Sequence, residues 1–477
     1  MELGTLLAIP LSDGRWTACQ IVGVTEKDLT VADLNWIGEE PPAVAQLRKV
    51  AVLNVDHHNW SGAVQWRHVA GPPPPEFRVV GVMPPLMKGE CKSYGSWLGL
   101  GQQIHLQARW DALPAKIRKA YKATPQGPGT EITLELGATQ KEVRASTSQI
   151  SVAGDVRWSE LDRLAHLTDL HFTGNDSKVL DFVRAHPLIA TLSWSGHGRS
   201  AIDLRDTNLT KVGVVVEAPL RLTLSREVRS LSVSGDASQL TVVQPGDGRA
   251  LSLMVNGRSP LGVKGLRALH SLDVVNATSV EVAPIARAHP SLSTLKLHGE
   301  AVQVPDFSTL GGLRELRVLE LYRCYGIDAK QVPVAAEVWP QLQRIAVDGF
   351  HKVDAARWKK CFAGVPHVEL RGGKTAAWLA ANLGNPFGEW TERSPAIGRA
   401  ATTAWRKARS AIGEGVDKKK GEKILEAFVA VFNKLDGKHG LDTIDREEIG
   451  DAFFDLATSA GISASVAEKW FDSWRDF

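Results

Sequence analysis

Two stretches of the sequence decide the fold prediction, RAHPLIATLSW at residues 184–194 and RAHPSLSTLKL at residues 287–297. Both run from Arg-Ala-His-Pro to a Thr-Leu pair, and the chain between their starts has room for five units of about 20 residues. Repeats of this length are typical of architectures that stack one small unit on the next. Pro187 and Pro290 are expected to end a helical turn, because proline cannot continue a helix and favours an extended residue before it.

Further copies of the repeat follow the pattern LxxLxL. Its last two apolar residues lie two positions apart, so they point to the same face of a short strand, which we expect to be buried. The central residues of consecutive copies, from Leu272 to Val368, follow one another in steps of 23 to 26 residues. The copies are Leu167-Leu170-Phe172, Leu269-Leu272-Val274, Leu292-Leu295-Leu297, Leu316-Leu319-Leu321, Leu342-Ile345-Val347 and Val365-Val368-Leu370.

With this spacing, residues 156–375 resemble the leucine-rich repeat family. The resemblance implies a solenoid, in which strands line one side and short helical turns the other. The middle of the region differs, because strand-like segments around Leu222, Leu231, Val242 and Leu253 follow one another about every 10 residues, which leaves little room for helices. We expect strands on both sides of short coils there.

Residues 1–120 are rich in strand signals. Short apolar runs lie at residues 6–9, 19–24, 50–55 and 77–82. Asp13-Gly14 between the first two runs predicts a β-hairpin, because these residues accept the positive φ angles of a tight turn. A short helix is predicted at residues 115–121. We therefore predict a β-rich N-terminal domain.

The same N-terminal region resembles the immunity protein 26 family of bacteria. The resemblance is carried by GTLLAIPL at residues 4–11, by DGRW at residues 13–16, and by WRHVAG at residues 66–71. It implies a domain that binds and neutralises a toxin or an effector. It names no individual target.

The rest of the chain completes the predicted domain organisation. Residues 121–155 are expected to be a linker and the first cap of the solenoid. Residues 376–477 are expected to form four or five helices that close its other end, since a solenoid must hide its last apolar layer. The predicted fold class is therefore α/β and multidomain, with a β-rich N-terminal domain, a leucine-rich-repeat solenoid and a C-terminal helical bundle cap.

Composition excludes several classes of protein. A net charge of +3 is too small to argue for nucleic acid as a partner. The four cysteines are far apart and form no CxxC pair, so neither a cysteine zinc site nor a disulfide framework is expected. The N-terminus lacks the charged and apolar segments of a signal peptide, and no run of about 18 apolar residues exists. We expect a cytoplasmic protein that does not enter the membrane.

Motifs for catalysis are not found in the sequence. It contains no GxxxxGK[ST], HExxH or GxSxG motif. His57 and His58 form the most reactive cluster, but neighbouring residues of a strand point to opposite faces and would not share one metal. We expect no catalytic residues, no metal and no cofactor, and we keep an enzyme site near these histidines as a minor alternative.

The prediction is a non-catalytic protein-binding module whose partner is another protein, such as a toxin, an effector or a regulatory protein. It would act by steric occlusion, as an immunity-type protein does. The alternative is a structural or signalling scaffold, for example one that binds a regulatory GTPase or an assembly component. Outward residues of the strands are the expected contacts, with Tyr and Arg as the best anchors. The predicted binding residues are His171, Asp273, Lys296, His298, Glu320, Tyr322, Arg323, Arg344 and Asp348.

Overall fold

The computed structural model describes residues 1–11, 14–74, 76–89, 91–256, 263–382, 384–413 and 416–477. The chain divides into two compact units. The first contains most of the chain up to Asp273 together with Arg287–Leu292, and the second contains Val274–Ala286 and Ser293–Phe477. The domain boundaries expected from the sequence remain predictions.

A five-stranded antiparallel sheet forms the N-terminal part. Its strands follow the order β6-β3-β2-β1-β7. They are β1 (Thr5–Pro10), β2 (Trp16–Val24), β3 (Asp28–Gly38), β6 (Trp66–Ala70) and β7 (Arg78–Val82). The predicted hairpin is confirmed by the pairing of β1 with β2, although residues 12 and 13 of its turn lie outside the described residues. The strand expected at residues 50–55 shrinks to β4 (Asn54–Val55), which pairs with β5 (Ala63–Val64).

Both faces of this sheet are covered by apolar residues. Leu7 and Cys19 belong to one cluster and Leu6 and Ala18 to another, so alternate residues of β1 and β2 enter different cores. Around the sheet lie α1 (Val44–Leu47), η1 (Trp97–Gly99) and α2 (Gln102–Ala112). Beyond α2, α3 (Ala115–Ala123) confirms the predicted helix, and its Tyr121 stacks on His166.

A buried carboxylate connects this sheet to α2. Asp33 on β3 is only 1% exposed. Its Oδ2 lies 3.5 Å from Nη2 of Arg67, and its Oδ1 accepts a 3.1 Å hydrogen bond from the backbone N–H of Gly101, the N-cap of α2. Burial raises the pKa of Asp33 to about 6, against the opposing effect of Arg67.

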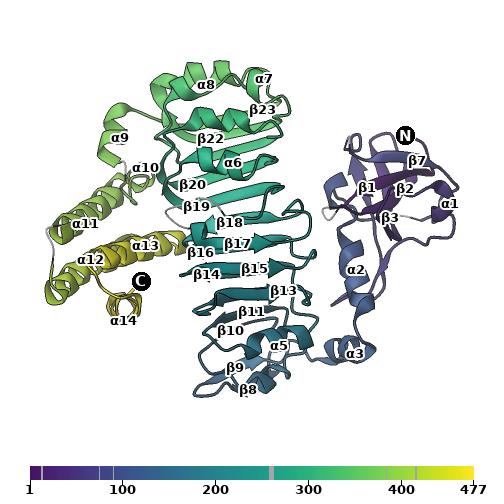
Figure 1. Cartoon of the computed structure of the whole chain (residues 1–477), viewed down its shortest axis with the longest axis horizontal. Coiled ribbons are helices and arrows are strands. Elements are labelled where there is room, and N and C mark those ends of the chain that lie inside the picture. Colours follow the sequence, from purple (N-terminus) through teal and green to yellow (C-terminus); the bar gives the residue numbers. More distant parts are fainter. Residues whose placement is uncertain (12–13, 75, 90, 257–262, 383, 414–415) are drawn as a thin grey trace. The chain divides into compact units, whose positions relative to one another are not determined.

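The large sheet has eleven strands in the order β10-β11-β12-β14-β16-β18-β19-β20-β21-β22-β23 (Figure 1). Every strand pair of this sheet whose register we describe is parallel. Its first six strands are β10 (Gln149–Ala153), β11 (Asp169–Thr173), β12 (Thr191–Ser195), β14 (Lys211–Val216), β16 (Ser230–Gly235) and β18 (Ser252–Asn256). The other five are β19 (Ser271–Ser279), β20 (Thr294–Gln303), β21 (Val318–Tyr322), β22 (Arg344–His351) and β23 (His367–Lys374).

The prediction of a leucine-rich-repeat solenoid is wrong. Within the described residues no solenoid is found, and the repeated strands join one large parallel sheet in a mixed α/β fold. Most inward residues were placed correctly, since Leu295, Leu297, Leu319 and Leu321 are all 0% exposed, but Val368 of the last copy is 42% exposed. Two apolar residues that lie two positions apart indicate only that one face of a strand is buried. They do not indicate how that strand is arranged with others. Parallel strands with short crossovers carry the same signal as repeats of a solenoid.

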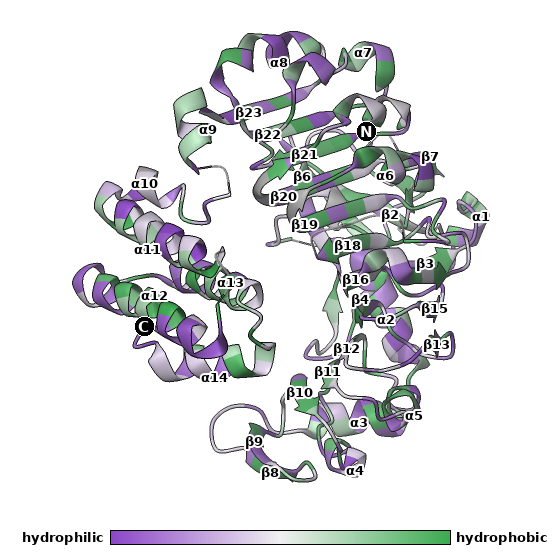
Figure 2. Ribbon diagram, turned by 60° about the vertical axis from the view of Figure 1, so that its left-hand side comes forward, coloured by the Kyte–Doolittle hydropathy of each residue, from purple (hydrophilic) through white to green (hydrophobic). Residues whose placement is uncertain are grey.

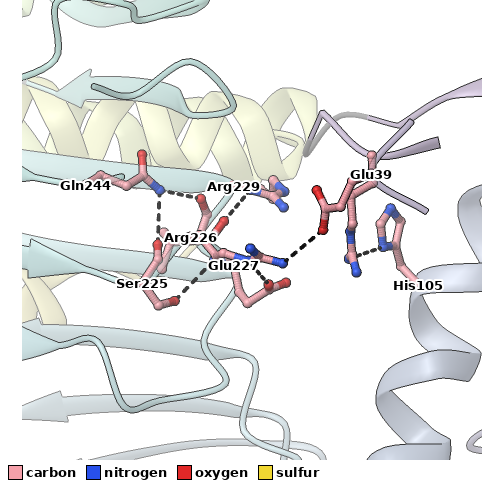
Figure 3. Close-up of polar contacts among 9 residues, drawn as sticks. Glu39, His105, Ser225, Arg226, Glu227, Arg229 and Gln244 are labelled. Carbon is pink, nitrogen blue, oxygen red and sulfur yellow. Dashed lines mark hydrogen bonds and ion pairs between the residues drawn. The ribbon is translucent and has the colours of Figure 1, made fainter. Parts of the chain in front are cut away.

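The middle of the region alternates between two sheets. Strands β13 (Ala201–Leu204), β15 (Leu220–Leu224) and β17 (Leu240–Val243) form a separate three-stranded parallel sheet, while β14, β16 and β18 belong to the large one. The expected strands on both sides of short coils are therefore confirmed. The buried side chain of Gln244 stabilises one of these coils, because its Nε2 donates to the carbonyl oxygens of Ser225 and Val228 at 3.2 and 2.8 Å (Figure 3).

Short helices connect the strands elsewhere. The α-helices are α4 (Trp158–Leu161), α5 (Lys178–Ala185), α6 (Val282–Ala288), α7 (Ala335–Val338) and α8 (Ala355–Cys361). The 3-10 turns are η2 (Ala237–Gln239), η3 (Phe307–Gly312), η4 (Ala329–Gln331) and η5 (Lys352–Asp354). The hairpin of β8 (Glu131–Glu135) and β9 (Gln140–Arg144) precedes the first strand of the large sheet.

The C-terminal part is helical, as expected. It consists of α9 (Ala376–Asn382), α10 (Trp390–Arg393), α11 (Pro395–Gly413), α12 (Lys418–His439), α13 (Thr443–Ser459) and α14 (Ala464–Trp474). A capping box between Asp442 and Asp445 starts α13. The expected role as the cap of a solenoid falls with the solenoid itself. Polar contacts of these helices with the sheet go to Arg323 and Tyr325, next to β21, and Nζ of Lys374 on β23 lies 4.6 Å from the ring centroid of Trp378 on α9.

No helix in the described part of the chain is long and apolar enough to cross a membrane.

We expect the buried Asp33 to make stability depend on pH. Its folded pKa of about 6 lies above the value of about 4 in an unfolded chain, so the folded state binds the proton more tightly. The protonated carboxyl stabilises the folded state fully below about pH 4, and this stabilisation is lost as pH rises through 6. The free energy of unfolding should then fall by on the order of 2 to 3 kcal/mol. Urea unfolding from pH 4 to 7 should show a smaller fall in stability for Asp33→Asn than for the unchanged chain. The exposed Asp181→Asn is the control, and an identical pH profile for Asp33→Asn would contradict the prediction.

Candidate protein-binding site

The outward side chains of β20 to β23 form the candidate site. The strand register aligns them in rows that cross the four strands. Alternate residues of the same strands point into the core, so hydrophobic and hydrophilic positions alternate along each strand (Figure 2). One row contains Lys296, Glu320, Ala346 and Glu369, and the next contains His298, Tyr322, Asp348 and Arg371.

Charges of alternating sign connect these rows into a ladder. Glu320 binds two cations, with its Oε2 at 2.9 Å from Nζ of Lys296 and its Oε1 at 3.3 Å from Nε of Arg344. Arg344 continues to Glu369, with 3.5 Å between Nη2 and Oε2. Arg371 then bridges Glu369 at 3.1 Å and Asp348 at 3.2 Å. The ladder therefore runs over all four strands.

Glu320 is the most buried member of the ladder. Its side chain is 10% exposed, whereas those of Arg344 and Glu369 are 46% and 44% exposed. A buried carboxylate is tolerated only when cations and donors satisfy it, and Glu320 has Lys296 and Arg344 on its two oxygens. The hydroxyl of Tyr322 adds a longer contact of 3.5 Å.

An aromatic pair lies beside the ladder. The rings of His298 and Tyr322 are stacked, with centroids 4.5 Å apart and an angle of 29° between their planes. Both side chains are half-buried, so they are held by their neighbours and still present part of their surface. Rigid aromatic side chains of this kind lose little entropy when a partner covers them.

Arg323 connects the sheet to the C-terminal helices. It follows β21 directly and has a φ of +55°, a conformation that residues other than glycine rarely adopt. Its Nη2 lies 3.5 Å from Oε2 of Glu389 and 3.8 Å from Oε1 of Glu448 on α13. Backbone strain of this kind persists only where the surroundings hold it, and it is concentrated at functional sites.

A cavity of about 410 Å³ surrounds this contact, lined by Arg323, Glu389, Arg393, Ile444 and Glu448. Arg393 also binds Asp445 at 2.8 Å and lies 3.6 Å from Glu448. Each carboxylate of the lining thus has an arginine partner.

Two aromatic donors fix the carboxylates of the cavity. The hydroxyl of Tyr325 donates to Oε1 of Glu389 at 2.9 Å, and the indole of Trp390 donates to Glu448. Burial and the nearby charge of Glu389 hold the pKa of Tyr325 far above its usual range, so it remains a donor. The positions of Glu389 and Glu448 are therefore set by groups that do not ionise near neutral pH.

The histidine pair of the N-terminal part has a different geometry from the one expected. Residues 56–60 are not a strand, and His58 has a φ of +50°, so the two Nδ1 atoms approach to 3.0 Å. His57 is 3% exposed, and its Nε2 lies 2.7 Å from Oε1 of Gln103. Burial, together with the nearby charges of His57 and Lys122, lowers the pKa of His58 to about 4. Both rings take part in packing between the loop and α2 and α3.

His58 also contacts aromatic rings that continue this packing. Its ring lies 5.3 Å from that of Trp110 and 5.4 Å from that of Tyr121. Tyr121 in turn stacks on His166 at 3.8 Å. In the described residues, no group of three His, Cys, Asp or Glu side chains is arranged to hold a metal ion.

The structure brings together most of the predicted binding residues. Lys296, Glu320 and Arg344 share the ladder, and Asp348 joins it through Arg371. His298, Tyr322 and Arg323 lie beside the ladder. The last two of the nine, His171 on β11 and Asp273 on β19, belong to the other compact unit and are not part of this site. Binding by any of these residues stays a prediction.

Several members of the site were missed by sequence reasoning. Glu369 and Arg371 are the outward residues of the last copy of the repeat, so the same register would have found them. Glu389, Arg393 and Glu448 lie in the helical part, where no periodicity connects them to the sheet. Only the fold brings them to Arg323.

No protein-family model matches the chain, and no curated protein matches its sequence.

We expect Glu320 to stabilise the sheet more than the exposed members of the ladder do. Glu320→Ala would leave Lys296 and Arg344 without their shared carboxylate and lower the free energy of unfolding by about 1 to 3 kcal/mol. Glu369→Ala is the matched control and should cost less than about 1 kcal/mol, because exposed ion pairs contribute little. Urea unfolding measures both, and equal losses for the two variants would contradict this account of Glu320.

Proposed function

We propose that this chain is a non-catalytic protein-binding protein that takes its partner on the outward face of β20 to β23. The observation that carries the proposal is the ladder of alternating charges beside the His298–Tyr322 pair. Arginine and tyrosine are the side chains most often found at energetic centres of protein interfaces. Here both kinds lie together on one face, held in place by neighbouring strands.

A protein is a better partner for this face than a small molecule. The outward rows cross four strands, and their charges alternate in sign, which suits a partner surface with its own alternating charges. Local pairing makes the ladder close to neutral, so long-range attraction of nucleic acid is not expected. Such a face selects a partner by register and complementarity more than by net charge.

Steric occlusion is the simplest mechanism for such a protein. A partner seated on the face would have its own active surface covered, with no reaction at the contact. The resemblance of residues 1–120 to the immunity protein 26 family favours a toxin or an effector as the partner. The alternative is a scaffold that holds a regulatory protein, and it would use the same face without blocking the partner's activity.

We expect the partner to be lost when the anchors of this face are truncated. The immobilised full chain should capture the partner from a lysate of its host, and mass spectrometry identifies it. Tyr322→Ala and Arg344→Ala should each weaken the purified complex about 30-fold or more, as measured by calorimetry, because central anchors contribute about 2 kcal/mol each.

Matched controls come from elsewhere in the chain. Tyr94 is 79% exposed, and Arg205 is exposed and paired with Asp203, so Tyr94→Ala and Arg205→Ala remove the same side-chain types from other surfaces. Neither should change the affinity more than about 3-fold. Normal binding by Tyr322→Ala and Arg344→Ala, or loss of binding in Tyr94→Ala alone, would rule out this face. An activity assay of the partner in the complex then separates occlusion from scaffolding.

A further inference from the structure

The outer edge of β23 is an unpaired edge of the large parallel sheet. β23 is the last strand in the sheet order, and among the strands that the structure describes none pairs with its outer side. The backbone N–H of His367 donates to the carbonyl of Gln343 beside β22. Residues 367, 369 and 371 therefore turn their backbone groups to β22, whereas residues 368 and 370 turn theirs outward. The regular alternation ends at Gly372, which has a φ of +69°.

The opposite edge of the same sheet, at β10, is covered by the β8–β9 hairpin. There β10 presents the carbonyl of Ser151 outward, and Nζ of Lys141 on β9 donates to it at 3.2 Å. The β8–β9 hairpin also lies close to the chain after β10, since a side chain at Gly137 would come within 2.3 Å of the carbonyl oxygen of Asp155. Proteins protect sheet edges in this way to prevent pairing with other chains. No comparable contact is described at β23.

The side chains at the open edge are accessible. Val368 points to the core side of the sheet and is nevertheless 42% exposed, and Arg371 on the outward side is 55% exposed. Exposure of an inward-pointing valine is what an edge strand shows when a further strand would cover it. The edge therefore combines free backbone groups with an uncovered apolar residue.

The charges on β23 are complementary to those of a second copy of β23. If two copies pair antiparallel with Leu370 opposite Leu370, Glu369 of each chain faces Arg371 of the other. Positions 369 and 371 form a pair without backbone hydrogen bonds in this register, and in such pairs the side chains come closest. Centring the pairing on Glu369 or on Arg371 is worse, because like charges then face each other. Centring it on Val368 needs a backbone donor from Pro366, which proline does not have.

We propose that this protein forms a homodimer by antiparallel pairing of β23 with β23 of a second copy. The twofold axis runs through the Leu370 pair, perpendicular to the sheet. The two sheets then continue as one, and the outward faces of both chains lie on the same side. Each dimer presents two copies of the charged ladder, joined across the axis by the pairs between Glu369 and Arg371.

Sedimentation velocity of the full chain over a concentration series tests the dimer. A contact made mainly by one strand is small, so we expect the transition from one chain to two at micromolar concentrations, complete by roughly 200 µM. Val368→Pro removes an outward N–H and adds bulk at the edge without removing a bond to β22. It should stay monomeric throughout, and Val368→Thr should dimerise like the unchanged chain.

Val368→Lys is a second variant designed to prevent dimer formation. It keeps the backbone N–H and so controls for a disturbance of the strand by proline. A lysine on an edge strand opposes pairing through its charge and length. Thermal unfolding of each variant shows that the fold is retained. A chain that remains monomeric at the highest concentration, or a dimer that persists in both Val368→Pro and Val368→Lys, would overturn the proposal.

Charge reversal tests the register itself. Arg371→Glu and Glu369→Arg each place like charges opposite one another, so either variant alone should dimerise at least 10-fold more weakly than the unchanged chain. Mixed together, the two variants restore opposite charges at both positions and should form a heterodimer. Failure of the mixture to associate, while each variant is folded, would overturn the register even if the unchanged chain dimerises.

Discussion

The structure depends on the burial of one face of the strands that lie between β10 and β22 in the large parallel sheet. Each of these strands gives alternate residues to the core, and Leu295, Leu297, Leu319 and Leu321 are completely buried there. Parallel hydrogen bonding then fixes the neighbouring strands in register, so the residues between the core positions must line up in rows on the other face. The ladder from Lys296 to Arg371 follows from this constraint. Its members are neighbours because the core residues on either side of them are in register from strand to strand.

Within the ladder, the burial of each charged side chain determines how much its ion pairs contribute to stability. Glu320 is almost enclosed and shared by two cations, so it fixes the arrangement of its neighbours. Arg344 and Arg371 are about half exposed and keep one side toward solvent. A partner bound as proposed would compete for Arg371, which contacts Glu369 and Asp348, and would leave both cations on Glu320 in place. Specificity at such a face comes from the order of charges along it, since the charges nearly cancel in sum.

The residues of the core strands could be predicted from the sequence, and the architecture could not. The LxxLxL register correctly identified Leu170, Leu295 and Ile345 as buried, because a spacing of two is a local property of a strand. Whether such strands form a solenoid or one parallel sheet depends on how they pair with one another, which the register does not encode. The candidate site likewise contains residues that the strand register predicts and residues that only the fold brings together. Lys296 and Arg344 were found from the register, whereas Glu389 and Glu448 reach Arg323 only through the packing of the C-terminal helices.

The C-terminal helices contact the sheet in more than one place. A helical segment that follows a row of strands is expected to contact the last one, and Lys374 of β23 does lie over the ring of Trp378 on α9. The ion pairs of the helices, however, run from Glu389 and Glu448 to Arg323, beside β21, where these residues line a cavity. Because the edge of β23 and the face of β20 to β23 are different surfaces of the same strands, pairing at the edge would leave the face open. Recognition of a partner and association of two chains would then be compatible, because the second copy would contact only β23, through its outer backbone groups and the side chains of Glu369 and Arg371, while the outward side chains of β20 to β22 would stay on the open face.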